Sequence, residues 1–467
     1  MNPHLATVVY AIGIACLFWL NRDREARTSK ALWIPVVWLL INGSRPVSAW
    51  LQMAPVMDSP DRYLDGSPVD AAVWAMLLAL GIIVLCMRAR RVGTLLRANA
   101  PILLFLLYCA SSVLWSDYPM VAFKRWTKGV GDVVMILIVL TDPHQFTAVR
   151  RLLTRVGFVL VPLSLLFIKY YPELGRSYHP WTWVPMFAGV TMGKNLLGMM
   201  CMICGLGSLW CFLSAYRGLE GGPRTRQLLA HGVLLGMIIW IFWLINSMTS
   251  LSCFVLAGGV IVAMSVPWLA RSRAAIHVLA GGVVCISLIA LFFDTGGHLV
   301  GSLGRDATLT GRTTIWSVVL SLAPRPLLGA GYESFWLGSR LEQVWEGVHE
   351  KGIQEAHNGY LEVYLNLGWV GVSLLGILIL TGYRNVVAAL RREPDTGRLM
   401  LAFFLATVIY SLTEAGFRMM ALTWITFLLA IVAVPSAAGQ TATIESFQTT
   451  RVGTDMPPRR LSLGAES

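Results

Sequence analysis

Charge is what this sequence lacks most. Only 13% of its 467 residues are charged, whereas 56% are hydrophobic. Soluble domains carry about 25% charged residues, so the shortage excludes an ordinary soluble protein. The mean hydropathy of +0.65 and the long apolar runs instead predict an all-α polytopic membrane protein.

Cysteine is missing from the polar segments. All eight cysteines fall inside apolar runs, which excludes an outer domain held by disulfides. Cys201 and Cys204 have C-x-x-C spacing, but thiolates are costly in an apolar helix, so we interpret the pair as packing residues. A P-loop and a glycine-rich dinucleotide motif are also missing, and we do not expect nucleotide use.

The net charge of +12 does not indicate nucleic-acid binding, because most of the positive residues sit in short loops between apolar runs, as the positive-inside bias predicts. We expect about 12–13 transmembrane helices. The second candidate contains Arg45 and Pro46 and the fifth is short, so either could be broken or tilted. The thirteen candidates lie near 5–21, 32–51, 71–87, 100–114, 129–141, 155–170, 194–214, 230–246, 250–269, 275–293, 360–383, 398–413 and 418–436.

Lysine and arginine placement predicts the domain organisation and orientation. Residues 1–293 should hold ten spans, the first being a span and not a cleaved signal peptide, and residues 359–436 three more. Residues 294–358 should form one long loop on the outer side, carrying short helices. The tail, 437–467, should be cytoplasmic and disordered.

The long outer loop contains the first candidate site residue. Thr310 begins a helix-like pattern that places Arg312 in the first turn, where the helix dipole disfavours a cation. An arginine there suits an anionic ligand such as phosphate, although an ordinary surface arginine fits the pattern too. We predict that Tyr332–Trp345 forms an amphipathic helix lying on the bilayer surface.

The end of the loop contains the second group of candidates. His357 lies where the loop meets a span, at a depth suited to a base that faces an aqueous pocket. Asn358, Glu362 and Asn366 recur every four residues and form a polar stripe on an apolar helix. An acidic group at membrane depth is a functional candidate, although His357 and Glu362 could both be structural.

Further cations lie on the predicted outer side, against the positive-inside bias. They include Arg125, Lys194 and Arg418, and Trp, Tyr and Pro residues surround them. Such cations suggest an anionic ligand, but an aromatic belt with cations reaching toward the interface would look the same.

Several motifs, in order, resemble the O-antigen ligase and O-antigen polymerase family, and especially its exopolysaccharide-production members. They are WSDYP with KRW (115–126), MGKNLLG (192–198), GRTTIW (311–316), PRPLLGAGYESFW (324–336) and HNGYLEVYLNLGWVG (357–371). The resemblance spans roughly Asp117 to Val370.

The resemblance implies a fold and an activity. It implies a GT-C-like glycosyltransferase of the bacterial inner membrane that needs no metal and no cofactor. Its donor would be an oligosaccharide on undecaprenyl diphosphate, and its acceptor a lipid A core or another lipid-linked glycan. A flippase and a chain-length regulator would be partners. Family arginines hold the diphosphate and a loop histidine assists the acceptor, roles that fall here on Arg312 and His357.

One departure and two rival functions remain. The family commonly has a cation in a Ser-[Arg/Lys]-[Thr/Ser] segment, but here Met248 takes that place. Lys194, Arg125 or Arg418 could supply the missing charge, with Asn358 and Glu362 orienting His357 or an arginine. A transporter of the lipid-linked glycan and a non-catalytic scaffold are the alternatives, although cations gathered at one face favour chemistry over transport.

Overall fold

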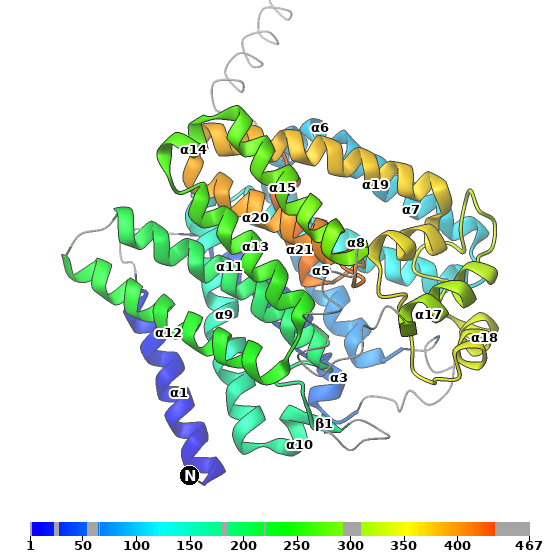
Figure 1. Cartoon of the computed structure of the whole chain (residues 1–467), viewed down its shortest axis with the longest axis horizontal. Coiled ribbons are helices and arrows are strands. Elements are labelled where there is room, and N and C mark those ends of the chain that lie inside the picture. The colour runs from blue at the N-terminus through cyan, green and yellow to red at the C-terminus, as the bar shows by residue number, and fades with distance from the viewer. Residues whose placement is uncertain are drawn as a thin grey trace, which may run out of the picture.

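The computed structural model describes residues 2–22, 28–53, 64, 66–178, 185–218, 221–292 and 310–434. The described chain is a bundle of helices with one small two-stranded antiparallel sheet (Figure 1). The first part of the predicted long loop (294–309) and the predicted tail (437–467) lie outside the described residues.

The first half of the bundle contains both long and broken helices. In chain order its elements are α1 (Pro3–Leu20), the 3₁₀ turn η1 (Lys30–Leu32), α2 (Trp33–Asn42), α3 (Val47–Trp50), α5 (Pro68–Met87), α6 (Ala89–Ala98), α7 (Ala100–Ser111), the 3₁₀ turn η2 (Ser112–Trp115), α8 (Pro119–Leu140), α9 (Gln145–Tyr170), α10 (Pro172–Gly175), β1 (Arg176–Tyr178) and β2 (Pro185–Phe187).

The second half carries the long loop between two groups of helices. Its elements are α11 (Lys194–Gly218), α12 (Gly221–Ile245), α13 (Met248–Ala263), α14 (Pro267–Arg271), α15 (Arg273–Phe292), α17 (Thr310–Ser321), α18 (Gly338–Val348), α19 (Gly359–Arg392), α20 (Pro394–Tyr410) and α21 (Leu422–Ile431).

Every one of the thirteen predicted spans overlaps a helix, which confirms the all-α class. Among the described residues, six helices are long and apolar enough to cross a membrane, namely α1, α5, α9, α11, α12 and α19. A seventh candidate is the pair α6 and α7, which is bent by 88° between Ala98 and Ala100. The chain is therefore a polytopic helical membrane protein.

The two irregular spans turned out differently. The second is broken as expected, because α2 ends at Asn42 and Pro46 precedes the short α3. The fifth is not short, since it is the second half of the 22-residue α8. Pro119 suits the first turn of that helix, and the charges in KRWTK interrupt the apolar run without interrupting the helix.

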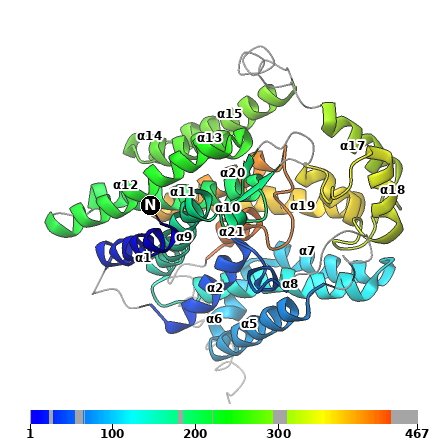
Figure 2. The same cartoon turned by 90° about the horizontal axis from the view of Figure 1, so that it is seen from below.

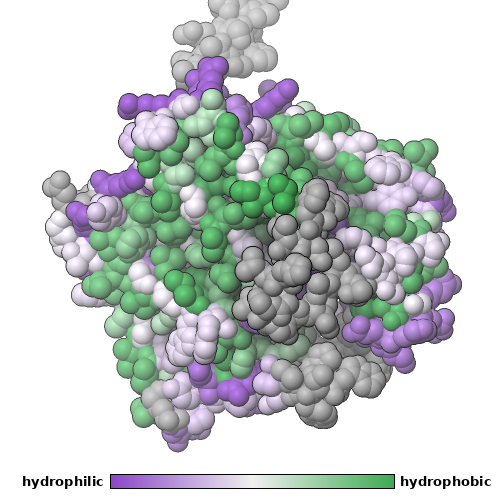
Figure 3. Space-filling model, viewed as in Figure 1, coloured by the Kyte–Doolittle hydropathy of each residue, from purple (hydrophilic) through white to green (hydrophobic). Residues whose placement is uncertain are grey.

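Burial separates central helices from peripheral ones. In the most apolar stretch of α11, 78% of residues are buried, against 11% in α1. α11 packs on α9, α12 and α13, and α20 packs on α13, α19 and α21. Seen from below, α1 and α12 lie apart from α5 and α6, with α11 and α21 between them (Figure 2). Apolar residues cover much of the face in Figure 3, and hydrophilic ones gather at its upper edge, as expected for a surface in contact with lipid.

Helix α19 is broken at Gly368, where the backbone takes φ 63° and ψ −166°. Residues 326–331 of the long loop run beside this break. Ala330 and Gly331 donate backbone hydrogen bonds to the carbonyls of residues 365 and 366, at 3.0 and 2.8 Å, and Trp369 donates to the carbonyl of residue 326 at 2.9 Å. The loop thereby satisfies backbone groups that the break leaves free in apolar surroundings.

The described part of the long loop has a hydrophobic core of its own. Residues from α17, α18 and the turn between them form most of it, and Leu365 of α19 also belongs to it. The first group includes Ile315, Val319, Phe335, Trp336 and Leu341. The prediction of a bilayer-surface helix over Tyr332–Trp345 is therefore wrong. The helix starts only at Gly338, and its apolar face packs on protein.

The early residues of that predicted helix form a turn for a clear reason. Glu333 has a positive φ of 52°, which the interior of an α-helix does not allow. Gly331 before the turn and Gly338 at its end also have positive φ, of 96° and 54°. The backbone amides of Tyr332 and Phe335 are bonded to the side chains of Ser112 and Asn366, at 2.9 and 3.0 Å. Long-range hydrogen bonds thus override the helical propensity of this stretch.

Candidate functional site

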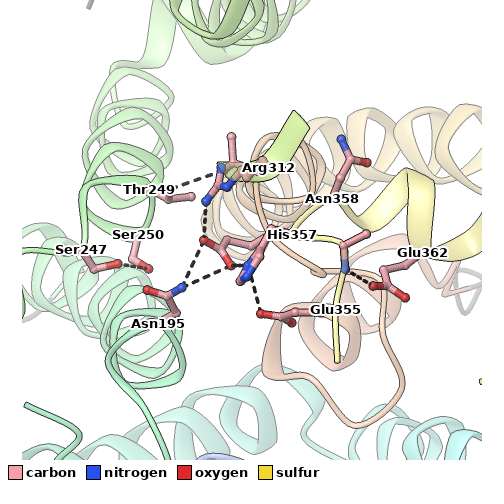
Figure 4. A network of polar contacts seen from close by, with 12 residues as sticks. Asn195, Ser247, Thr249, Ser250, Arg312, Glu355, His357, Asn358 and Glu362 are labelled. Atoms are coloured by element: carbon pink, nitrogen blue, oxygen red, sulfur yellow. Dashed lines mark hydrogen bonds and ion pairs between the residues drawn. The ribbon is translucent and has the colours of Figure 1, made fainter. Parts of the chain in front are cut away.

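A single carboxylate, that of Glu414, joins three parts of the chain. It accepts from Nη2 of Arg312 at 3.1 Å and lies 3.1 Å from Nδ1 of His357. Nδ2 of Asn195 lies 3.4 and 3.5 Å from its two oxygens. The Glu414 side chain is only 6% exposed, so these partners are what stabilise its charge. Figure 4 shows the side chains of Arg312, His357 and Asn195 pointing toward this one carboxylate.

Each partner comes from the end of a helix. Arg312 lies in the first turn of α17, as predicted, and it does face an anion, the carboxylate of Glu414. His357 precedes α19 and has a left-handed φ of 48°. Asn195 is the second residue of α11. Glu414 itself lies between α20 and α21, so the site forms where the long loop meets the bundle.

His357 also contacts a second carboxylate. Its Nδ1 lies 3.1 Å from Oε1 of Glu355, and its side chain is 27% exposed. Burial lowers the pKa of His357, but the hydrogen bond to Glu414 and the charges of Glu355 and Glu414 outweigh burial, so its pKa is raised above the ordinary value despite the opposing charge of Arg312. No described residue bonds to Nε2 of His357.

Arg125 and Arg418 both contact a different residue, Glu333. Nε of Arg418 lies 3.3 Å from Oε2 of Glu333, and Arg125 donates to the backbone carbonyl of Glu333. Arg418 also donates to the carbonyl of Gln354 at 3.4 Å, three residues before His357. Burial lowers the pKa of Arg418, but the negative charges of Glu333, Glu362 and Glu355 outweigh burial and raise the pKa above its ordinary value. The guanidinium therefore stays charged. Through Arg418, this second ion cluster is hydrogen-bonded to the chain segment that precedes His357.

Lys194 and Asn358 are the remaining predicted site residues. Lys194 begins α11 beside Asn195, is partly exposed, and has no hydrogen-bond or ion-pair partner among the described residues. Asn358 caps α19 by accepting from the amides of Tyr360 and Leu361, both at 3.0 Å. It also donates to the carbonyl of Leu412 at 3.1 Å. Asn358 therefore joins the start of α19 to the segment that carries Glu414.

Glu362 does not take the contacts predicted for it. Its oxygens accept from Nε1 of Trp336 at 2.8 Å and from the amide of Ala356 at 2.5 Å, and within the described chain it bonds neither to His357 nor to an arginine. Because Ala356 precedes His357, Glu362 can position the imidazole only through the backbone. The predicted stripe continues to Asn366, which holds the turn at Phe335.

We expect Glu362→Gln to lower the stability of the folded protein by about 1–3 kcal/mol, because an amide can accept only one of the two buried hydrogen bonds. Thermal unfolding of the purified protein would measure the loss. Glu346→Gln, at an exposed position of α18, is the matched control. Equal unfolding temperatures for the two variants would show that the Glu362 carboxylate does not hold this turn.

The segment Asn246–Ser250, where the family commonly has a cation, lies beside the site. Thr249 and Thr413 are joined through their hydroxyls at 3.4 Å, and Ser247 donates to Ser250 at 3.2 Å. Figure 4 places Ser247, Thr249 and Ser250 near Asn195. Met248 is 42% exposed. The segment thus reaches the neighbourhood of Glu414 without adding a positive charge.

The W-S-D-Y-P segment (115–119) holds the long loop at contacts separate from those of Glu414. Asp117 pairs with Arg340 at 2.6 Å, Ser116 bonds to Ser334 at 2.9 Å, and the carbonyl of Trp115 accepts from Arg325 at 2.6 Å. These contacts fix the loop next to α8, and Arg125 of α8 donates a hydrogen bond to the backbone carbonyl of Glu333.

Sequence reasoning missed Glu414, Glu355, Glu333 and Asn195. Glu414 lies four residues before Arg418, and Asn195 directly follows Lys194. Both stand beside predicted cations, but the prediction considered only positive charge at these places. Glu355, His357 and Glu414 also place ligand atoms within 4.8 Å of one another. Such a group suits a divalent cation, although Arg312 already shares the Glu414 carboxylate.

The fold and the site define a polytopic helical membrane protein with a charged cluster at the junction of its loop and bundle. Residues 224–376 match the family model described as O-antigen ligase. The exopolysaccharide production protein ExoQ of Rhizobium meliloti (strain 1021) is 25% identical over 316 residues, which cover 66% of this chain and 69% of that protein. Both matches support the resemblance to the O-antigen ligase family that the motifs implied.

The match to the family model separates the site residues into two groups. It contains Arg312, His357, Asn358 and Glu362, with Glu355 and Glu333. Arg125, Lys194, Asn195, Glu414 and Arg418 lie outside residues 224–376. The family region thus supplies the histidine and one arginine, while Glu414, which binds both, comes from a later part of the chain.

Proposed function

We propose that the protein is an integral-membrane glycosyltransferase of exopolysaccharide or O-antigen synthesis. It would transfer or polymerise an oligosaccharide carried on undecaprenyl diphosphate, on the periplasmic side of the bacterial inner membrane. The observation that carries the proposal is the His357 imidazole, held by Glu414 and Glu355 with Arg312 on the same Glu414. The likeness to the O-antigen ligase family and to ExoQ supports the same activity.

In this proposal His357 is the base. With Nδ1 oriented by Glu414 and Glu355, Nε2 takes the proton of the acceptor hydroxyl as its oxygen attacks the anomeric carbon of the donor sugar. The bond between that carbon and the phosphate oxygen breaks, and the electron pair leaves with the lipid diphosphate. The product diphosphate needs no proton if cations surround it.

The cations near the site would hold that diphosphate. An arginine has five N–H donors, so Arg312 can bind Glu414 and still donate to phosphate. Lys194 starts α11 next to Asn195 and has no partner among the described residues. Arg125 and Arg418 would contribute from the Glu333 cluster. The acceptor would be another lipid-linked glycan in a polymerase, or a lipid A core in a ligase.

The test is turnover by the purified protein in liposomes, with lipid-linked oligosaccharide donor and acceptor presented to the side of the membrane that carries the long loop. Formation of a longer glycan or of a glycosylated acceptor, with release of lipid diphosphate, supports the proposal. Movement of the donor between leaflets without any product would contradict it and would indicate a transporter.

The pH dependence of turnover should report on Glu414. A base acts when neutral, so the rate should rise as the pH increases through the raised pKa of His357. Glu414→Gln removes the negative charge that raises this pKa, so the acidic limb of the pH–rate profile should move to lower pH. Glu355→Gln should move it the same way by a smaller amount.

The comparison uses the pH of half-maximal rate, which is independent of the maximal rate itself. Glu342→Gln in α18 is the control, because Glu342 is exposed and does not contact His357. An acidic limb that stays in place in Glu414→Gln, or moves to higher pH, would show that His357 is not the group whose ionisation limits the rate.

A further inference from the structure

A second charged site lies at the opposite ends of the helices that form the first. A cavity of about 590 Å³ is lined by four arginines and one aspartate. The arginines are Arg217 at the end of α11, Arg271 at the end of α14, Arg391 near the end of α19, and Arg398 in α20; the aspartate is Asp395. The lining therefore carries an excess of positive charge.

Arg398 is the buried member of this group. Its side chain is 6% exposed. Nη1 donates to Ser265 at 3.0 Å and Nη2 to Ser214 at 2.9 Å, and the guanidinium also pairs with Asp395. Its Nε is buried without a hydrogen-bond partner. Since Asp395 can balance only one charge, the other arginines are left without an acid in the cavity wall.

The position of the cavity follows from helix direction. α11, α13, α19 and α20 each have one end at the Glu414 site and the other end at this cavity. α20 alone, with 17 residues, separates the two by about 25 Å at 1.5 Å per residue. In Figure 1, α14 lies at the top of the molecule, far from α17 and α18. The cavity therefore lies on the opposite face of the bundle from the candidate site.

We propose that this cavity binds the phosphate group of an anionic ligand, and that the headgroup of an acidic phospholipid supplies it. Arginine suits phosphate because its planar fork donates two parallel hydrogen bonds. Basic pockets between helix ends, at headgroup depth, bind anionic lipid headgroups. Met264, Ala270 and Leu390 add apolar lining, which a lipid uses and a free ion does not.

The experiment measures the thermal unfolding midpoint of the full-length protein in detergent, with increasing phosphatidylglycerol, phosphatidylcholine or inorganic phosphate. Phosphatidylglycerol should raise the midpoint and phosphatidylcholine should not. Arg271→Gln/Arg391→Gln should need about 30-fold more phosphatidylglycerol, because each basic residue near a membrane surface contributes roughly a factor of five. Both residues are exposed, so the changes should not prevent folding.

Arg273→Gln/Arg384→Gln is the matched control, because it removes two exposed arginines from α15 and α19 that do not line the cavity. It should respond to phosphatidylglycerol as the unaltered protein does. Two results would overturn the proposal. One is an equal response of the two double variants to phosphatidylglycerol. The other is an unfolding midpoint of the unaltered protein that neither phosphatidylglycerol nor inorganic phosphate raises. A rise with inorganic phosphate as well would support a phosphate site and remove the lipid preference. Arg391→Gln against Arg384→Gln repeats the comparison if a double variant is not recovered.

Discussion

Replacement of His357 by asparagine is expected to lower the rate of glycan transfer by about 10²–10⁴-fold, the usual contribution of a general base. Asparagine tolerates the left-handed backbone that His357 adopts at φ 48°, so the loop should keep its path while the proton acceptor is lost. Product formed per amount of purified protein, in the liposome assay above, is the measurement.

His349→Asn is the matched control. His349 lies in the same loop, is exposed, and also has a left-handed φ, of 59°. It should retain full activity. If His357→Asn is equally active at an equal protein level, the base must be sought elsewhere, and Glu355 would be the next residue to replace.

Gly368→Ala is expected to prevent accumulation of folded protein. A Cβ at this position would lie 2.3 Å from the carbonyl carbon of Leu327, and the backbone there has φ 63°. Neither the loop backbone nor α19 can move aside without breaking the hydrogen bonds between them. We expect a loss of more than about 3 kcal/mol, well beyond a typical substitution, measured as the yield of monodisperse protein in detergent.

Gly376→Ala, eight residues further along α19, is the control. A Cβ there meets nothing within 4 Å, so the variant should be as stable as the unaltered protein, or more stable by about 0.5–1 kcal/mol. Normal yield of Gly368→Ala would mean that α19 need not be broken at this point.

The helices were predictable because lipid-facing and buried helices share one requirement, a long apolar run. The start of α17 at Thr310 and the place of His357 before α19 were predictable as well, because helix starts and loop–span junctions depend on neighbouring residues. The length of α8 was not, since Lys124, Arg125 and Lys128 break its apolar run while the helix continues through them.

The contacts of the site were beyond local sequence reasoning. Glu414 meets His357 across 57 positions and Arg312 across 102, and no spacing rule relates residues so far apart. The prediction of a helix over Tyr332–Leu337 failed for the same reason. The turn found there depends on hydrogen bonds to Asn366 and Ser112, which are distant in the sequence. Glu362 was recognised correctly as a buried acid, but its partners, Trp336 and Ala356, are set by that turn.

The pairing of residues 326–331 with the break in α19 has a mechanical consequence. A loop whose backbone is bonded into a transmembrane helix is part of the wall of the bundle, and swinging it outward would expose unpaired amides and carbonyls to apolar surroundings. We therefore expect this stretch of the loop to move only together with α19.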